Sequence, residues 1–288
     1  MPSTPDDPAL LNLQDEPQIA QDPFETMGVV KVIIQSAHID TRNEWWWSRP
    51  PNPFVVVQVD VARATTSTQA ATYDPSWLTQ AFCLLVKSPK EDVKMMVYNS
   101  HRHRKYRSLL GAASFSMSNL TESRMSLDVQ LSLLKARRRA GDLSCSFFYY
   151  PISMSSEIDA GIGIARLTVH WAEELQQVSI KPMAQIRLGW DAPPIHVTPR
   201  RKNAVWESTH EFLCFNMTTC VVYIDVVDPG PKLDDPLIGH VCICLMDLVE
   251  ATKAKRGRWA LSGCSTGKLV ASAQWRKLSD QASDTIGL

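Results

Sequence analysis

The amino-acid sequence contains the same series of short motifs twice, once over residues 27–153 and again over residues 161–278. Each copy opens with a glycine and a run of β-branched residues, continues through an Asp/Asn-x-x-Trp turn and a Leu/Ile-Gly step, and closes on a strand-like segment. These marks lie at 28–32, 74–77, 109–111 and 149–151 in the first copy, and at 163–169, 203–206, 237–239 and 274–275 in the second. A period of about 130 residues is too long for a solenoid repeat and matches two whole domains.

The segments between these turns are typical of β-strands. Short runs rich in Val, Ile, Thr and Phe are separated by clusters of Pro, Gly, Asn, Asp and Ser. In the first copy the expected strands are 29–34, 54–61, 82–86, 94–98, 112–117 and 143–149, and the only expected helices of the chain are 120–134 and 247–254. This spacing predicts an all-β fold of two tandem eight-stranded antiparallel β-sandwiches.

Charge is distributed unevenly along the chain. Residues 1–26 contain six acidic residues, five prolines and no base, so we expect a disordered acidic leader rather than a signal peptide. Residues 27–153 contain 16 Lys and Arg against 9 Asp and Glu, a net charge of +7. The polar segment 154–160 is expected to be the linker, and residues 279–288 a tail.

Two further features bear on where the protein resides. No apolar run approaches the roughly 18 residues that a membrane-spanning helix requires. The seven cysteines lie mostly in apolar, strand-like runs, which favours reduced core thiols in a cytosolic protein over a disulfide framework.

The motifs resemble those of C2 domains, and in their order they are similar to the central pair of C2 domains in tricalbins, the fungal relatives of extended synaptotagmins. The resemblance rests on residues 73–77, 97–102, 108–115 and 141–151 of the first copy, and on 163–172, 203–213, 235–239, 247–252 and 267–278 of the second. It implies two C2-like sandwiches that dock on membranes. Tricalbins also carry a membrane hairpin and a lipid-transfer domain, for which residues 1–26 offer no room, so we expect the central pair alone.

C2 domains that bind calcium use acidic side chains from two loops, because the cation takes about six to eight oxygen ligands. In the first copy Asn52 stands where an acid is expected, and the third loop, residues 99–107, carries cations instead of carboxylates. The second copy keeps Asp228, Asp234 and Asp235, but Gly230 replaces one acid. We therefore expect no metal, and we interpret the three remaining acids as solvated loop residues of a degenerate calcium loop.

The candidate lipid-binding residues are tryptophans and cations of the end loops. They are Trp45, Trp46 and Trp47 in one loop of the first copy, Arg102, Arg104, Lys105 and Arg107 in another, and Arg200, Arg201 and Lys202 before the second turn motif. Tryptophan prefers the bilayer interface, and anionic headgroups attract each nearby Lys or Arg by about 1 kcal/mol. The alternatives are that the rings cap the sandwich core and that the basic loops are merely solvated.

Signs of catalysis are weak. Residues 263–268 imitate a phosphate-binding loop, but the spacing is one residue short and a strand follows. His240, Cys242 and Cys244 share a strand face, a pattern more typical of packing than of a zinc site. The cations also lack the aromatic platform of single-strand nucleic-acid binders.

We therefore predict a protein that is not an enzyme and has no cofactor. It binds anionic or phosphoinositide-containing membranes without calcium, on the cytosolic side of the endoplasmic reticulum or plasma membrane, with other membrane-contact proteins as further partners and no nucleic acid. The alternative is a protein–protein adaptor in which degenerate C2 folds scaffold a membrane-associated or metabolic assembly.

Overall fold

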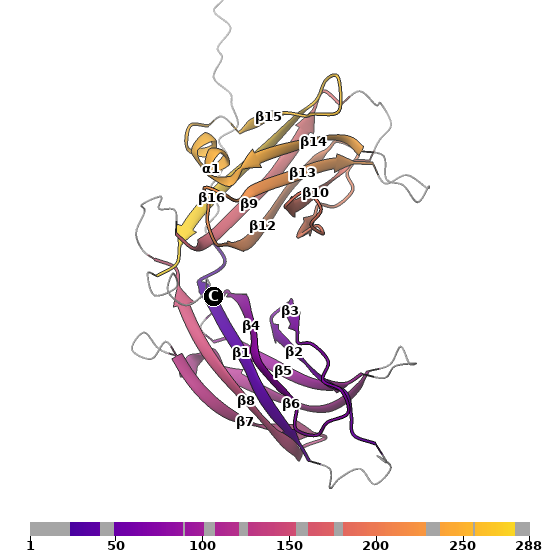
Figure 1. Ribbon diagram of the computed structural model, residues 1–288. Helices are drawn as coiled ribbons and strands as arrows, with labels where there is room; N and C mark the ends of the chain where they lie inside the picture. Colours follow the sequence, from indigo (N-terminus) through magenta and orange to yellow (C-terminus); the bar gives the residue numbers. More distant parts are fainter. Residues whose placement is uncertain are drawn as a thin grey trace, which may run out of the picture.

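The protein folds into two β-sandwiches joined at one end of each (Figure 1). The computed structural model describes residues 24–40, 49–88, 90–100, 107–120, 126–153, 161–175, 181–228, 237–255 and 257–279. Within these ranges no helix is both long enough and apolar enough to cross a membrane.

In the part of the chain that the structure describes, the first sandwich contains eight antiparallel strands. They are β1 (Gly28–Ile39), β2 (Pro53–Val59), β3 (Ala62–Thr65), β4 (Ser76–Val86), β5 (Asp92–Asn99), β6 (Ser108–Ser116), β7 (Ser126–Lys135) and β8 (Arg138–Pro151), with a 3-10 turn at Met117–Asn119. Their order in the sheet is β3-β2-β5-β6-β7-β8-β1-β4. Strands β6 and β7 are joined by the single pair Ala112 and Leu134, where the sheet folds over into two layers.

Alternating apolar residues form the core of this sandwich. Val55, Val57 and Val59 of β2 are buried, as are Val93, Met95 and Val97 of β5, because side chains two positions apart point to the same face of a strand. Phe115 and Phe147 stack at 3.9 Å between ring centroids. Trp77 of the turn motif is 2% exposed and donates its indole N–H to the Ser67 carbonyl oxygen at 2.8 Å.

The helix predicted for residues 120–134 is wrong. Strand β7 pairs with β8 from Ser126 opposite Phe148 to Lys135 opposite Arg138. The physical reason is a two-residue period in which Leu127, Val129, Leu131 and Leu133 alternate with Ser, Asp and Gln, as a half-buried strand requires.

Over its described residues the second sandwich also has eight strands, in two sheets of four. They are β9 (Gly163–Glu173), β10 (Met183–Leu188), β11 (His196–Val197), β12 (Val205–Cys214), β13 (Val221–Val227), β14 (Leu237–Cys244), β15 (Arg258–Ala260) and β16 (Lys268–Lys277). The sheet orders are β11-β10-β13-β14 and β12-β9-β16-β15.

Helix α1 (Leu245–Lys253) confirms the helix expected at 247–254. Trp206 has the same role as Trp77, because its indole N–H donates to the Pro182 carbonyl oxygen at 3.2 Å. The predicted fold class is thereby confirmed.

Backbone pairing and an apolar cluster hold the two sandwiches together. Ile152 forms an antiparallel bridge with Leu278, and the Ser153 N–H donates to the Lys277 carbonyl oxygen at 2.7 Å. Around this bridge Val29 and Tyr150 of the first sandwich pack with residues of the second in one cluster, which also includes Ile162, Ile164, Leu213 and Leu278. We call this region the junction.

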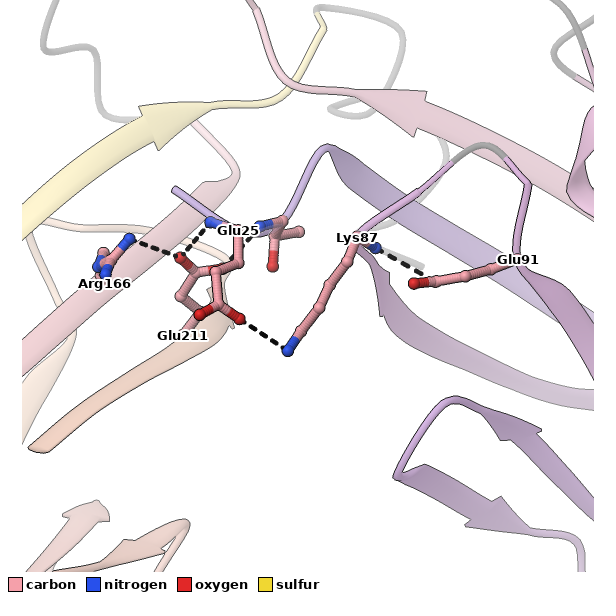
Figure 2. A network of polar contacts seen from close by, with 6 residues as sticks. Glu25, Lys87, Glu91, Arg166 and Glu211 are labelled. Carbon is pink, nitrogen blue, oxygen red and sulfur yellow. Dashed lines mark hydrogen bonds and ion pairs between the residues drawn. The ribbon is translucent and has the colours of Figure 1, made fainter. Parts of the chain in front are cut away.

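A polar network adds to the junction (Figure 2). The Glu211 carboxylate on β12 accepts the backbone N–H groups of Glu25 and Thr26, at 3.0 and 2.9 Å, and lies 3.6 Å from Nη1 of Arg166. Lys87 in turn donates to the Glu25 carboxylate at 2.8 Å and thereby lowers the pKa of Glu25. Residues 24–26, which the sequence placed in the leader, are thus bound to the second sandwich; the remaining domain limits stay predictions.

Candidate membrane-binding surface

The loops that carry the predicted lipid-binding residues of the first sandwich leave from one end, opposite the junction (Figure 1). Strand β1 starts beside the junction and ends at Ile39, and the chain returns at Pro53 of β2, opposite Asn99 at the end of β5. Asn99 is also paired with Ser108, where β6 begins. The bases of the two loops, 40–52 and 100–107, therefore lie side by side, and we call this region the loop end.

Most of the predicted residues of these loops lie outside the described ranges. These are Trp45, Trp46, Trp47, Arg102, Arg104 and Lys105. Arg107 is described, and its exposed guanidinium lies 5.2 Å from the centre of the Phe54 ring, which itself stacks on Tyr98 at 5.7 Å. A guanidinium held over an aromatic face keeps its N–H donors available for an anion.

Asn52 ties the base of the two loops together. Its backbone N–H donates to Oδ1 of Asn99 at 2.8 Å, and its amide NH2 donates to the Ser100 carbonyl oxygen at 3.3 Å. Its side-chain oxygen accepts the Ala71 N–H at 2.9 Å. An ionised aspartate has no donor for the Ser100 oxygen, so the amide serves the hydrogen bonds of this loop base and contributes no negative charge for a cation.

In the second sandwich the predicted cations Arg200, Arg201 and Lys202 are exposed and lie in the turn between β11 and β12. Arg200 lies with Nη2 3.5 Å from Oδ1 of Asp228, whose side chain is 19% exposed. One of the three acids that the sequence assigns to a degenerate calcium loop thus faces a guanidinium. Asp234 and Asp235 lie outside the described ranges.

The two patterns that weakly resemble a metal site and a phosphate-binding loop lie on or beside strands of the second sandwich. His240 and Cys242 lie on β14 opposite Asp225 and Tyr223, and among the described residues no group of three His, Cys, Asp or Glu side chains is placed to hold a metal. The segment 263–268 leads into strand β16, which begins at Lys268, and Nζ of Lys268 forms an ion pair with Oε1 of Glu174 at 2.6 Å.

All seven cysteines, each within the described ranges, are free thiols; Cys145 and Cys214 are buried, Cys242 is exposed and the other four are partly buried, so not all of them are the core thiols that the sequence predicts. Burial raises the pKa of Cys145 to about 12, so this thiol stays protonated and unreactive at neutral pH.

One basic segment at the loop end is absent from the predicted site residues. Residues 135–139, Lys-Ala-Arg-Arg-Arg, form the turn between β7 and β8. The run of positive charge is itself a sufficient signal, but it directly follows residues 120–134, for which a helix is expected.

Comparison with known proteins agrees with this architecture. The family model of the C2 domain matches residues 28–132 and 163–260, and C2 domains generally bind phospholipid membranes. A search of curated proteins found no match.

Three solved structures of extended synaptotagmin 2 have a similar fold. Its tandem pair of C2 domains, solved with calcium bound, has 15% identity and a TM-score of 0.66, with 88% of this chain and 98% of that chain covered. Another structure of the same two domains has 16% identity, a TM-score of 0.62 and coverage of 94% and 98%. A structure of the same pair together with the SMP domain has 16% identity, a TM-score of 0.68 and coverage of 88% and 57%. The chain belongs to the C2 domain family, with two C2 domains in tandem that share the fold of the extended synaptotagmin pair.

Proposed function

We propose that the protein is a calcium-independent, tricalbin-like peripheral membrane protein that docks the loop end of its first C2 domain on anionic or phosphoinositide-containing membranes. The observation that carries this proposal is the net charge of +7 of residues 27–153, combined with a loop end where Arg107 is exposed beside the base of loop 40–52. We call this loop, which contains Trp45, Trp46 and Trp47, the tryptophan loop. Attraction of about 1 kcal/mol per cation near an anionic surface makes such a domain a reversible membrane ligand.

Independence from calcium is supported by one observation in each C2 domain. A calcium ion needs about six to eight oxygen ligands at roughly 2.3 to 2.6 Å. In the first domain the Asn52 amide is engaged in loop hydrogen bonds, and in the second Arg200 lies 3.5 Å from Asp228. A divalent cation at Asp228 would be placed beside a guanidinium, which opposes its binding.

The junction supports joint action of the two C2 domains. Because the bridge between Ile152 and Leu278 and the Glu211 network hold the domains together, landing of the first domain keeps the second domain close to the membrane. Arg200, Arg201 and Lys202 then add their contacts at an effective concentration of about millimolar. We place this docking on the cytosolic face of the endoplasmic reticulum or plasma membrane, with no catalytic step.

Liposome flotation tests the proposal. The whole protein should float with phosphatidylserine-containing vesicles equally in calcium and in chelator, and should stay at the bottom with pure phosphatidylcholine vesicles. Arg104→Glu with Lys105→Glu should reduce binding at least about tenfold, since each cation contributes about 1 kcal/mol. Trp45→Ala with Trp46→Ala should remove most of the blue shift in tryptophan emission on binding without lowering the melting temperature.

Two outcomes would reject the proposal. Wild-type protein that fails to float at low salt, even on phosphoinositide-rich vesicles, would favour the adaptor function. Flotation only in the presence of calcium would refute the calcium-independent mechanism.

A further inference from the structure

The turn between β7 and β8 carries a dense cluster of positive charge, and no function has been proposed for it above. Four of the five residues from 135 to 139 are cations: Lys135, Arg137, Arg138 and Arg139. The last three side chains are exposed, and that of Arg139 is 65% exposed while it pairs with Asp142. The positive charges of Arg137 and Arg138 therefore face solvent at the tip of the turn.

The backbone presents these cations on a fixed hairpin. Lys135 pairs with Arg138 across a two-residue turn, in which Ala136 and Arg137 have φ values of 48° and 66°. Positive φ at both central residues is the geometry whose twist matches that of the flanking strands. The cations thus start from a rigid base, and less ordering is needed when they bind a surface.

The hairpin lies at the loop end, beside the start of the tryptophan loop. Gly141 of β8 pairs with Ile39, the last residue of β1, and the Asp40 N–H donates to the Ala140 carbonyl oxygen at 2.9 Å. Gly141 has a φ of 138°, and a Cβ there would lie 1.9 Å from the His38 carbonyl oxygen. Only glycine permits this close approach, which ties the hairpin to the end of β1.

An apolar side chain accompanies the cations. Leu134, two residues before the central pair of the turn, is 51% exposed, and it pairs with Arg139 on β8. A soluble polyanion would attract the cations but would gain nothing from an exposed leucine. A bilayer interface interacts favourably with both, because the headgroups attract the charges and the acyl boundary accepts the apolar side chain.

We propose that the β7–β8 hairpin, through Arg137 and Arg138 with Leu134 beside them, is a binding site for the anionic phospholipid surface. It acts together with the two loops at the same end of the first C2 domain. The proposal rests on the proposed function, and it adds a contact region that neither the loops nor the second domain contains.

Partitioning of the whole protein onto phosphatidylserine–phosphatidylcholine vesicles tests this site. The variant Arg137→Gln with Arg138→Gln should bind about 25-fold more weakly than wild type, since each cation near an anionic surface changes partitioning about fivefold. It should also depend less on salt. The matched control, Lys90→Gln with Lys255→Gln, removes the same charge from exposed positions, one in the turn after β4 at the junction side and one after α1 in the second domain. The control should bind within about twofold of wild type, because exposed charges more than about 10 Å from the surface are screened at 0.1 M salt.

The outcomes separate this site from the proposed function. If wild type binds and Arg104→Glu with Lys105→Glu weakens binding, but the hairpin variant binds within about threefold of wild type, the hairpin site is refuted and the proposed function stands. Equal weakening in the control variant would also refute it, since net charge alone would then explain the effect. Failure of wild type to bind the vesicles would reject both. Should the glutamine variant melt early, Arg137→Asn with Arg138→Thr gives the same change of charge with residues suited to a left-handed turn position and to a strand.

Discussion

Replacing Glu211 by glutamine should destabilise the junction specifically. The Glu211 carboxylate is 10% exposed, receives two backbone N–H groups from residues 25 and 26, and faces the Arg166 side chain, which is 8% exposed. Glutamine has the same shape but keeps only one oxygen, so one N–H group loses its acceptor and the charge opposite Arg166 disappears.

The size of the effect follows from these contacts. A hydrogen bond to a charged group contributes about 1.5 to 3 kcal/mol, and breaking a buried ion pair costs about 3 to 5 kcal/mol. Because the amide of Glu211→Gln retains one hydrogen bond, we expect a loss of about 2 to 4 kcal/mol in the free energy of unfolding. Glu25→Gln is the matched control; Glu25 and Lys87 are 64% and 47% exposed, so its loss should stay below about 1 kcal/mol.

Urea unfolding followed by tryptophan fluorescence measures both variants, and hydrogen exchange measures the junction directly. The amides of Glu25 and Thr26 should exchange faster in Glu211→Gln, while amides in the core of the first sandwich, such as that of Val57, should stay protected in the folded state. Equal losses in the two variants, or unchanged exchange at Thr26, would show that the network does not hold the junction.

Three further predictions follow from other parts of the molecule. Calorimetric titration with calcium at low millimolar concentration should show no saturable binding, and a micromolar site in wild type would contradict this. Asp228 should contribute to calcium binding only when the neighbouring guanidinium is removed, as in Arg200→Ala. Burial lowers the pKa of His210 from 6.5 to about 4, so the unfolded chain binds a proton at a higher pH than the folded protein does. The free energy of unfolding should therefore fall as pH drops from 7 to 5, by roughly 1 kcal/mol after allowance for partial exposure. The urea midpoint of His210→Gln should change less over this range. Gly141→Ala should cost more than about 3 kcal/mol, because the new Cβ meets the His38 carbonyl oxygen at a residue with positive φ; a thermal melt close to that of wild type would refute the packing argument.

The sequence by itself determined the fold class, because the signals for it are local. Val55, Val57 and Val59 follow the two-residue period of a strand, and this period depends only on neighbouring residues. Trp77 and Trp206 could likewise be recognised as equivalent, since each follows the same type of turn. The wrong helix at 120–134 came from neglect of the same period, which was present in the sequence.

The junction and the joint position of the candidate site residues were decided only by the tertiary structure. Glu211 binds the backbone of Thr26 across 185 positions of sequence, and no local pattern marks an exposed-looking glutamate on a strand as the acceptor of a distant main chain. The bases of the two loops meet through the pairing of Pro53 with Asn99, and the basic hairpin reaches the same end through the pairing of Ile39 with Gly141. Such pairings depend on which strands become neighbours when the sheet folds over, and that choice is made by burial across the whole sandwich rather than by the residues of any one segment.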